Sequence, residues 1–251
     1  MINLKAKTVL ITGGSKGIGE ACVKIFCRSG AEVAFTYNSG KENSQRLVEA
    51  FTHETKIKAY KVDLNKAEEI ESQVLKIIRD FGRVDILVNN AGIWKYGKAD
   101  MMSLEDWEET IRVNLTATFL FTKAVIPVMK ANGFGRIINI TSTAGQRGEP
   151  FYSHYASSKG GVISFTKSLA AELGEFNITV NSVAPGWVIS DMTKDVFADE
   201  EYKQKISNEI PVKRIATPED IAGPVLFLAS DLARHINGEI LNVNGGSILC
   251  G

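Results

Sequence analysis

Three side chains between residues 142 and 159 are of the types that can transfer a proton to or from an oxygen. Ser142 carries a hydroxyl, Tyr155 a phenol and Lys159 an amine. Residues four apart share one face of a helix, so a helix that begins near Tyr155 places the ammonium about one turn from the phenol. A cation at ~4 Å in an effective dielectric of ~20 favours the phenolate by roughly 4 kcal/mol, or ~3 pKa units. The spacing therefore predicts that Lys159 lowers the pKa of Tyr155 toward neutrality, which suits a general acid.

The same pattern also fits an ordinary amphipathic helix face that follows a loop hydroxyl, because short motif matches have a high false-positive rate. The strands and helices predicted around these three side chains help to distinguish a proton-transfer site from an ordinary helix face. Residues 8–12 form a short β-branched apolar run, the turn T-G-G-S-K-G-I-G follows at once, and residues 18–26 are apolar at helical spacing. A strand, a glycine turn and a helix N-terminus form a site for a pyrophosphate, although the turn departs from the G-x-G-x-x-G spacing. A glycine turn that merely ends a strand is the alternative.

The end of the second predicted strand, residues 31–37, bears on the choice of cofactor. Sites for NAD place an acidic residue there to hold the ribose diol, and this strand ends instead in Tyr37, Asn38 and Ser39. Lys16, inside the glycine turn, is placed to reach a 2′-phosphate, and Asn38 and Ser39 can donate hydrogen bonds to it. The sequence therefore favours NADP(H), with NAD(H) as a possible second cofactor.

Strand and helix patterns alternate along the rest of the chain. Further strands are predicted at 57–62, 84–88, 136–140, 178–183 and 239–243, and helices at 41–53, 66–81, 104–129 and 218–228. This alternation predicts an α/β fold, a single-domain doubly wound (Rossmann) fold over residues 1–251 with a seven-stranded, mostly parallel sheet and helices on both faces. The stretch N-N-A-G, residues 89–92, then lies at the carboxyl end of a central strand, where such sheets bind ligands.

Two segments carry further expectations. Asn114 lies between two apolar helical segments, where a polar amide is either a satisfied core group or a functional one. The second of these segments is apolar on more than one face, which is typical of deep burial or of a subunit interface. Residues 188–214 mix apolar and charged side chains over a long connection, which predicts a substrate lid with short helices of its own.

Composition excludes several classes of function. The 251 residues carry 29 basic and 29 acidic side chains, so the chain offers no basic field for nucleic acid and no polybasic membrane patch. Three cysteines form no C-x-x-C pair, and the N-terminal apolar run is interrupted by glycines. We therefore expect a cytoplasmic protein with no membrane or nucleic-acid partner. The three histidines show no ligand spacing, so no metal site is predicted, and His154 is expected at the surface.

With these residues in place, the chain resembles the short-chain dehydrogenase/reductase family over essentially its whole length. The order of the glycine turn, the Asp63-Leu64 pair, N-N-A-G, Asn114, Ser142, Y-A-S-S-K from Tyr155 and P-G at 185 carries the resemblance. It implies that Tyr155 protonates a carbonyl oxygen as hydride arrives, that Ser142 hydrogen-bonds the same oxygen, and that Lys159 binds the nicotinamide ribose. Asn114 would hold a water that links Lys159 to solvent.

The resemblance also assigns the cofactor contacts. Residues of the glycine turn would surround the phosphates, Asp63 and Leu64 would lie at the adenine, N-N-A-G at the adenine ribose, and P-G-W-V at the nicotinamide. The cofactor-binding positions expected are Gly13, Ser15, Lys16, Gly17, Ile18, Gly19, Tyr37, Asn38, Ser39, Asp63, Leu64, Asn90, Ala91, Gly92, Tyr155, Lys159, Pro185, Gly186 and Val188.

Within the family the chain looks most like the 3-oxoacyl-[acyl-carrier-protein] reductases of fatty acid biosynthesis, and family members often form homotetramers. One departure concerns the carrier protein: Gly133 and Phe176 stand where those reductases often carry arginines, with Lys130 and Arg136 nearby. This argues against docking of acyl carrier protein and leaves reduction of a small ketone untouched.

Two other functions remain open: a sugar or polyol dehydrogenase on the same scaffold, and a non-catalytic dinucleotide-binding protein. Trp94 and Tyr96, which follow N-N-A-G, either line the substrate pocket or pack within a loop.

Overall fold

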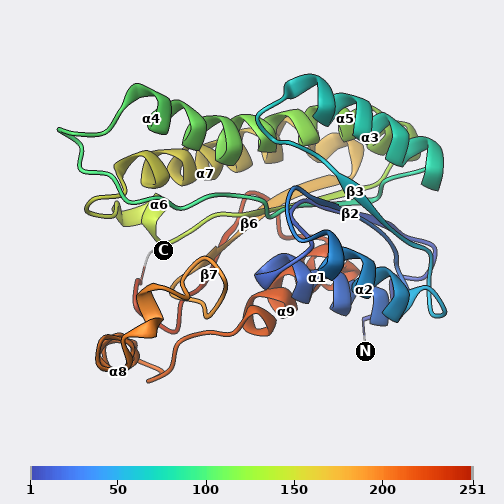
Figure 1. Ribbon diagram of the computed structural model, residues 1–251. Coiled ribbons are helices and arrows are strands. Elements are labelled where there is room, and N and C mark those ends of the chain that lie inside the picture. Colours follow the sequence, from blue (N-terminus) through green and yellow to red (C-terminus); the bar gives the residue numbers. More distant parts are fainter. Residues whose placement is uncertain (1, 250–251) are drawn as a thin grey trace.

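A single parallel sheet of seven strands organises the molecule (Figure 1). The computed structural model describes residues 2–249. The strand order is β3-β2-β1-β4-β5-β6-β7, and all six strand pairings are parallel. The sheet thus confirms the predicted doubly wound fold, and the strands agree with the predicted ranges to within a residue or two. The strands are β1 Thr8–Ile11, β2 Glu32–Tyr37, β3 Ile57–Lys61, β4 Ile86–Asn89, β5 Gly135–Ile140, β6 Ile178–Pro185 and β7 Ile240–Val243.

Burial explains the composition of the strands. Every residue of β4, β5 and β6 is buried, because helices cover both faces of a parallel sheet. At the edges, β3 alternates buried and exposed positions, and β7 is only half-buried along its length. The apolar runs predicted from the sequence are therefore the central strands.

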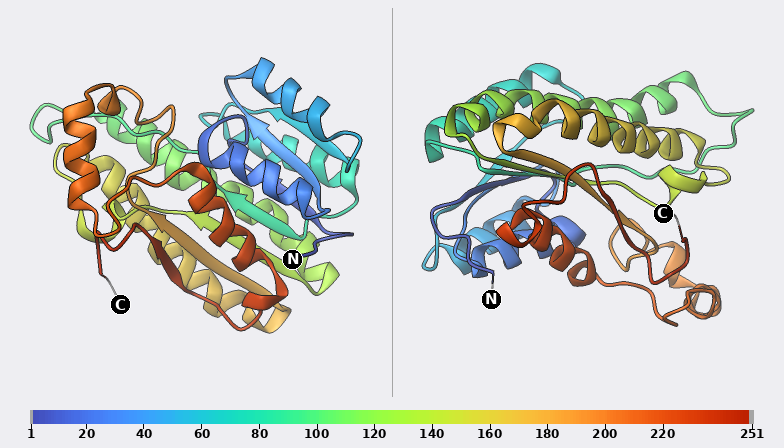
Figure 2. Two further views of the ribbon diagram at one scale, coloured as in Figure 1. Left: turned by 90° about the horizontal axis from the view of Figure 1, so that it is seen from below. Right: turned by 180° about the vertical axis from the view of Figure 1, so that it is seen from behind.

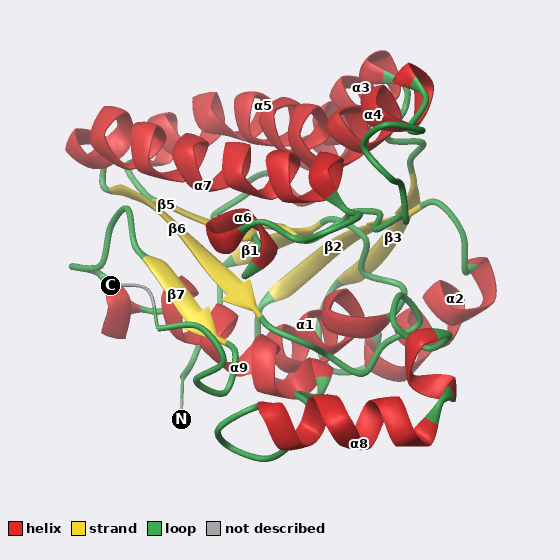
Figure 3. Ribbon diagram, turned by 90° about the vertical axis from the view of Figure 1, so that its left-hand side faces the viewer, coloured by secondary structure: helices red, strands yellow, loops and turns green. Residues whose placement is uncertain are grey.

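Helices form a layer on each side of the sheet (Figures 1 and 3). On one side, α3, α5 and α7 pack into a hydrophobic cluster that includes Phe121, Val125 and Met129. On the other, α1 and α9 pack around Phe26 and Phe35. The helices are α1 Gly17–Arg28, α2 Lys41–Phe51, α3 Ala67–Phe81, α4 Leu104–Ile111, α5 Ala117–Asn132, α6 Ala144–Arg147, α7 Ser153–Leu173, α8 Glu200–Glu209 and α9 Pro218–Ala229, with short 3-10 turns at Gly174–Phe176, Val196–Ala198 and Asp231–Ala233.

The two predicted helical segments around Asn114 are joined by a turn of π-helix, Arg112–Thr116. Together with α4 and α5 it makes one helical stretch, Leu104–Asn132, which is long and apolar enough to cross a membrane by length and composition alone. Its inner side packs on the sheet, whereas Phe119 on its outer side is 45% exposed. The apolar excess read from the sequence is thus divided between the core and an uncovered outer face.

The connection from β6 to α9 forms a separate small body at one end of the molecule (Figure 2). It contains the 3-10 turn Val196–Ala198 and helix α8, as expected for the predicted lid. Phe197, Ile206, Ile210 and Ile215 make a small hydrophobic cluster of their own, distinct from the two clusters that flank the sheet. Val188, at the start of the segment, belongs to the cluster that flanks the sheet, and Phe197 packs edge-on against Trp187.

Candidate active site

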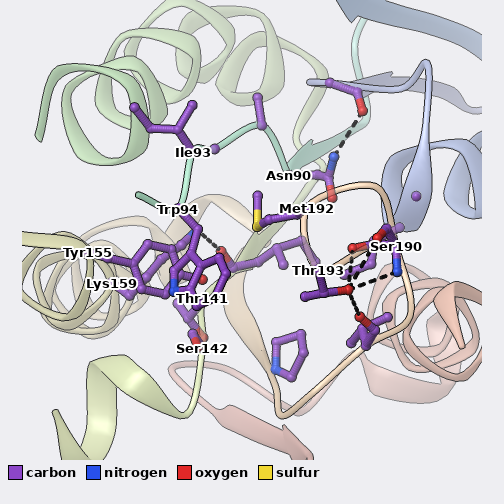
Figure 4. Close-up of a pocket in the computed structure, with 18 of the residues that line it drawn as sticks. Asn90, Ile93, Trp94, Thr141, Ser142, Tyr155, Lys159, Ser190, Met192 and Thr193 are labelled. Carbon is purple, nitrogen blue, oxygen red and sulfur yellow. Dashed lines mark hydrogen bonds between the residues drawn. The ribbon is translucent and has the colours of Figure 1, made fainter. Parts of the chain in front are cut away.

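A cavity of about 580 Å³ lies beyond the carboxyl ends of the central strands. Loops that follow β1, β2, β3, β4, β5 and β6 all contribute to its wall, together with α7 and the predicted lid. Figure 4 shows part of this wall. In a doubly wound sheet ligands bind here, because the strand order reverses between β1 and β4 and leaves a crevice at the carboxyl ends of the strands. The cavity brings together most of the residues singled out from the sequence.

The glycine turn has the conformation that only glycine adopts without strain at two of its positions. Gly13 and Gly17 have positive φ angles of +67° and +55°. Gly19, one turn into α1, lies so close to the turn that a Cβ there would collide with the carbonyl oxygen of Gly13 and approach Asn90 Nδ2 to 2.6 Å. The start of α1 is therefore pressed against the turn, and its free N–H groups face the cavity end that an anion would occupy.

Hydrogen bonds lock this turn to the N-N-A-G loop. Thr12 Oγ1 accepts from the backbone N–H of Asn90 at 2.9 Å and of Ala91 at 3.0 Å. The Asn90 side chain donates back to the carbonyl oxygens of Thr12 and Gly13, at 3.0 and 3.1 Å. The amide of Asn90 is thus committed to holding two loops together, while its remaining atoms line the cavity (Figure 4).

The end of β2 offers polar groups and no carboxylate to the same end of the cavity. Ser15 is buried, and its hydroxyl donates to the carbonyl oxygen of Ser39 at 3.2 Å. Lys16, Asn38 and Ser39 are exposed and line the cavity, as does Tyr37. A free ammonium beside two small polar side chains fits a 2′-phosphate better than a ribose diol.

The structure brings Ser142, Tyr155 and Lys159 to one wall of the cavity (Figure 4). Strand β5 delivers Ser142 just beyond its carboxyl end, and α7 carries the other two, one turn apart. Ser142 and Tyr155 are joined by a side-chain hydrogen bond. Lys159 Nζ donates to the carbonyl oxygen of Ile140 at 2.8 Å and lies 5.8 Å from the centre of the Tyr155 ring.

The predicted direction of the Tyr155 shift is wrong for this structure. Burial raises the pKa of Tyr155 to about 12, with the charge of Glu149 adding to the rise and the hydrogen bond with Ser142 opposing it. Burial also lowers the pKa of Lys159 to about 8. A fall in the pKa of Tyr155 requires a fully charged ammonium about 4 Å from the phenol. In the structure both groups lose hydration, and the Lys159 amine donates a hydrogen bond to the carbonyl oxygen of Ile140 instead.

Asn114 acts as a clamp from the middle of the π-helix. Its Oδ1 accepts from the backbone N–H of Ile93 at 2.8 Å, and its Nδ2 donates to the Ile93 carbonyl at 2.9 Å and to Ser158 Oγ at 3.1 Å. A Cβ on Gly92 would lie 3.1 Å from Asn114 Oδ1 and 3.6 Å from Lys159 Nζ. Asn114 therefore fixes the loop after β4 against α7 beside the lysine, and π-helical turns are often found at such functional positions.

Three predicted site residues do not line the cavity: Gly19, Asp63 and Asn114. Gly19 and Asn114 act behind the wall, as described above. The Asp63 carboxylate accepts from the Asn65 backbone at 3.0 Å and closes a local turn, which leaves Leu64 and Asn65 to face the cavity. Further residues that were not predicted from the sequence also line the cavity: Thr36, Val62, Asn65, Ile140 and Thr141. They lie at or just beyond the carboxyl ends of strands, and this position could have identified them.

An aromatic wall borders the cavity next to Ser142, Tyr155 and Lys159. Trp94 lines the cavity and stacks on Tyr152, with ring centres 4.3 Å apart and planes 4° apart. Trp187, from the turn after β6, meets Trp94 edge-on at 6.0 Å. Of the two aromatic residues after N-N-A-G, one lines the pocket and the other packs within a loop. Trp94 lines the cavity, whereas Tyr96 is 61% exposed and stacks on Phe151.

His154 is buried, with 1% of its surface exposed, and the expectation of a surface histidine is wrong. A Cβ on Gly97, in the loop between β4 and α4, would lie 3.7 Å from the His154 ring. Burial lowers the pKa of His154, with Asp106 opposing the shift. Within residues 2–249 no group of three or more histidine, cysteine or acidic side chains is arranged to hold a metal ion.

The chain is similar in sequence to known reductases over nearly its whole length. A family model described as enoyl-(acyl carrier protein) reductase matches residues 13–247. The chain is 42% identical to the 3-oxoacyl-[acyl-carrier-protein] reductase FabG of Aquifex aeolicus over 98% of each chain. It is 38% identical to the enzyme of the same name from Thermotoga maritima, over 99% of this chain and all of that one.

Among solved structures, a putative NAD(P)-dependent gluconate 5-dehydrogenase from Beutenbergia cavernae, crystallised with bound NADP, superposes with a TM-score of 0.91. It is 35% identical over 98% of each chain. Together with the parallel sheet, the glycine turn and the clustered Ser142, Tyr155 and Lys159, these full-length matches confirm the resemblance read from the sequence: the chain belongs to the short-chain dehydrogenase/reductase family.

Proposed function

We propose that the protein is an NADP(H)-dependent oxidoreductase that reduces the ketone of a 3-oxoacyl thioester to a secondary alcohol. The observation that carries this proposal is the single cavity that joins a phosphate-binding glycine turn to a hydrogen-bonded Ser142 and Tyr155. The relatives named as 3-oxoacyl-[acyl-carrier-protein] reductases support the substrate, and the neighbour with bound NADP supports the cofactor.

The residues present fit the nicotinamide cofactor. The glycine turn, where a Cβ on Gly19 would collide with the Gly13 carbonyl oxygen, would hold the phosphates, and the exposed Lys16, with Asn38 and Ser39, would bind the 2′-phosphate. Lys159 lies where the nicotinamide ribose is expected, and Pro185, Gly186 and Val188 line the adjoining wall. When bound, the cofactor supplies the hydride.

The protein handles the proton. A pKa of about 12 keeps Tyr155 protonated at neutral pH, so the phenol is ready to donate to the carbonyl oxygen as negative charge develops there. Ser142, hydrogen-bonded to that phenol, orients it and is placed to donate to the same oxygen. Lys159, with a pKa of about 8, can then return a proton to Tyr155 at little cost, and Asn114 holds the loop beside it.

Recognition of the carrier protein through basic side chains finds no support at the end of the helix layer. Gly133 ends α5 in a left-handed conformation, and the Lys130 ammonium stacks over Phe176 at 3.9 Å. Arg136 is only 2% exposed and donates to the carbonyl oxygens of Gly135 and Asn177. We infer that the acyl thioester is recognised in the cavity and that this edge does not bind acyl carrier protein.

We also infer a homotetramer and a cytoplasmic location. The outer apolar face of α4 and α5 supports assembly, with Leu104 and Phe119 exposed at 70% and 45%. Cys22 and Cys27 are both free and buried, which suits a reducing compartment.

A second candidate is oxidation of gluconate or a related polyol, favoured by the similarity to the putative gluconate 5-dehydrogenase. A non-catalytic nucleotide-binding role is less well supported, because it gives no reason for Ser142 to hydrogen-bond Tyr155 inside the cavity.

The test is a spectrophotometric assay of the purified protein with acetoacetyl-CoA and NADPH, beside gluconate with NADP⁺. We expect NADPH consumption that depends on the thioester and is at least tenfold more efficient than gluconate oxidation. Faster oxidation of gluconate would transfer the assignment to the polyol dehydrogenases, and nucleotide binding without turnover of either substrate would favour the non-catalytic role.

A further inference from the structure

A carboxylate lies inside the cavity beside the catalytic side chains, and the mechanism above does not use it. Glu149 lines the cavity and is half-buried, on the loop between Ser142 and Tyr155. Within residues 2–249 no ion pair neutralises it; Arg147, which is exposed on the same loop, acts on it only through space. An unpaired carboxylate in a partly desolvated pocket is costly, so its position calls for an explanation.

The aromatic wall holds this carboxylate in place. Trp94 lies next to Glu149 and opposes the rise in the pKa of this carboxyl group that burial causes. Tyr152 stacks behind the indole, and Trp187 fixes it from the side, so Trp94 has little freedom to turn. Figure 4 shows Trp94 in the same part of the pocket as Tyr155 and Lys159.

The charge of Glu149 acts on the Tyr155 phenol. It is one of the causes that raise the pKa of Tyr155, so its field reaches the phenol that faces the substrate oxygen. Other acidic side chains line the cavity as well, namely Glu109, Asp191 and Glu209. Its basic side chains are Lys16 on the glycine turn, the exposed Arg147, and Lys159, whose amine donates to the carbonyl oxygen of Ile140. Glu109 is paired with Lys95, and Asp191 and Glu209 are exposed. Within the described part of the chain, Glu149 is therefore the half-buried acid of this cavity that has no ion-pair partner.

We propose that Glu149, oriented by Trp94, makes the enzyme select esterified 3-oxoacyl substrates over the corresponding free 3-oxo acids. A free acid would bring a second carboxylate into a cavity from which water is partly excluded, where repulsion between like charges is strong. An ester or thioester of the same acyl group is uncharged and escapes this repulsion. The inference rests on the proposed function and names the feature of the substrate that this wall recognises.

The experiment compares ethyl 3-oxobutanoate with 3-oxobutanoate, which differ at the carboxyl group. Two quantities are measured for each: kcat/KM with NADPH, and the dissociation constant in the presence of NADP⁺, from quenching of tryptophan fluorescence. We expect the wild type to favour the ester by at least tenfold in both. Equal dissociation constants for ester and acid in the wild type would overturn the proposal without any variant.

Glu149→Gln keeps the size of the side chain and removes its charge. In this variant we expect the preference for the ester to shrink to within about threefold, through tighter binding of the acid. Glu68→Gln is the matched control, because Glu68 is exposed on α3, away from the cavity, and should leave the preference unchanged. Trp94→Phe, which keeps a ring and removes the N–H, should reduce the preference at least threefold in kcat/KM.

A preference that survives Glu149→Gln would contradict the inference while the proposed function stands. Failure of the wild type to reduce either acetoacetyl-CoA or the ester would instead contradict the proposed function, and the binding ratio measured with NADP⁺ would still decide the role of Glu149.

Discussion

Burial shifts the pKa values of the two titratable groups of the proposed catalytic cluster in opposite directions. It raises the pKa of the Tyr155 phenol to about 12 and lowers that of the Lys159 ammonium to about 8, because in each case the charged form loses hydration. Both shifts therefore favour the uncharged form of the group. A protonated phenol beside an amine of moderate pKa is the arrangement expected of an acid that must be reloaded after each turnover.

Replacement of Tyr155 by Phe removes the proton donor and little else. We expect kcat for the thioester to fall by about 10²–10⁴-fold, the usual contribution of a general acid. The NADPH dissociation constant, measured by fluorescence titration, should change by less than about threefold, because the glycine turn and Lys16 are untouched. Retention of wild-type turnover would remove Tyr155 from its assigned role.

The lowered pKa of Lys159 also predicts how stability depends on pH. Since the folded-state pKa of about 8 lies below the ordinary value of 10.5, the unfolded chain binds more protons between these values, and stability rises with pH across that window. Relative to Lys159→Met, the unfolding free energy of the wild type should rise by about 2 kcal/mol between pH 8 and pH 10. Denaturant titrations of both proteins check this, and parallel pH profiles would show that the amine is not desolvated.

Lys16 should set the choice of cofactor. It is the exposed cation on the glycine turn, beside the carboxylate-free end of β2. In Lys16→Ala we expect the ratio of kcat/KM for NADPH to that for NADH to fall at least tenfold, mostly through KM for NADPH. Lys5→Ala serves as the control, since Lys5 is exposed outside the cavity. An undiminished preference for NADPH would assign the 2′-phosphate to other groups.

At the scale of elements, the site depends on how closely α1 approaches the turn that precedes it. Gly19→Ala would drive a methyl group into the Gly13 carbonyl and Asn90, so the turn must shift. We expect NADPH affinity to fall at least tenfold. Gly174→Ala is the matched control, because Gly174 has ordinary helical angles and its new methyl would only touch Asn237 at 3.5 Å. Isothermal titration with NADPH separates the two, and equal affinities would show that the turn tolerates the shift.

The helices and strands could be predicted from the sequence, whereas several side-chain contacts between them could not. Periodicity found the strands and helices because burial on two faces makes β4, β5 and β6 continuously apolar. It could not show that Asp63 would turn toward Asn65, or that His154 would lie under a loop, since both outcomes depend on contacts made by the folded chain. The proximity of Glu149 and Trp94 could not be predicted either, because the two residues are 55 positions apart in the sequence and meet only in the folded chain.

At the scale of the whole molecule, one face remains to be covered. The outer side of the α4–α5 stretch exposes Leu104, Trp107 and Phe119, with Phe119 packed edge-on against Phe165 of α7. Phe119→Glu should therefore shift the protein from tetramer toward smaller species, which analytical ultracentrifugation would resolve. Leu75→Glu, on the exposed side of α3, is the control, with 54% of Leu75 exposed. A monomeric wild type, or a tetramer insensitive to Phe119→Glu, would contradict the assembly proposed above.

The sequence by itself determined the fold class, the family and the identity of Ser142, Tyr155 and Lys159, because strand and helix periods, glycine spacing and the i, i+4 pair are local properties of the chain. Only the tertiary structure decided the protonation of that pair, the clamp made by Asn114 and the carboxylate held in the aromatic wall. Desolvation and long-range hydrogen bonding arise from packing, and no local pattern in the sequence reports how much water a folded cavity excludes.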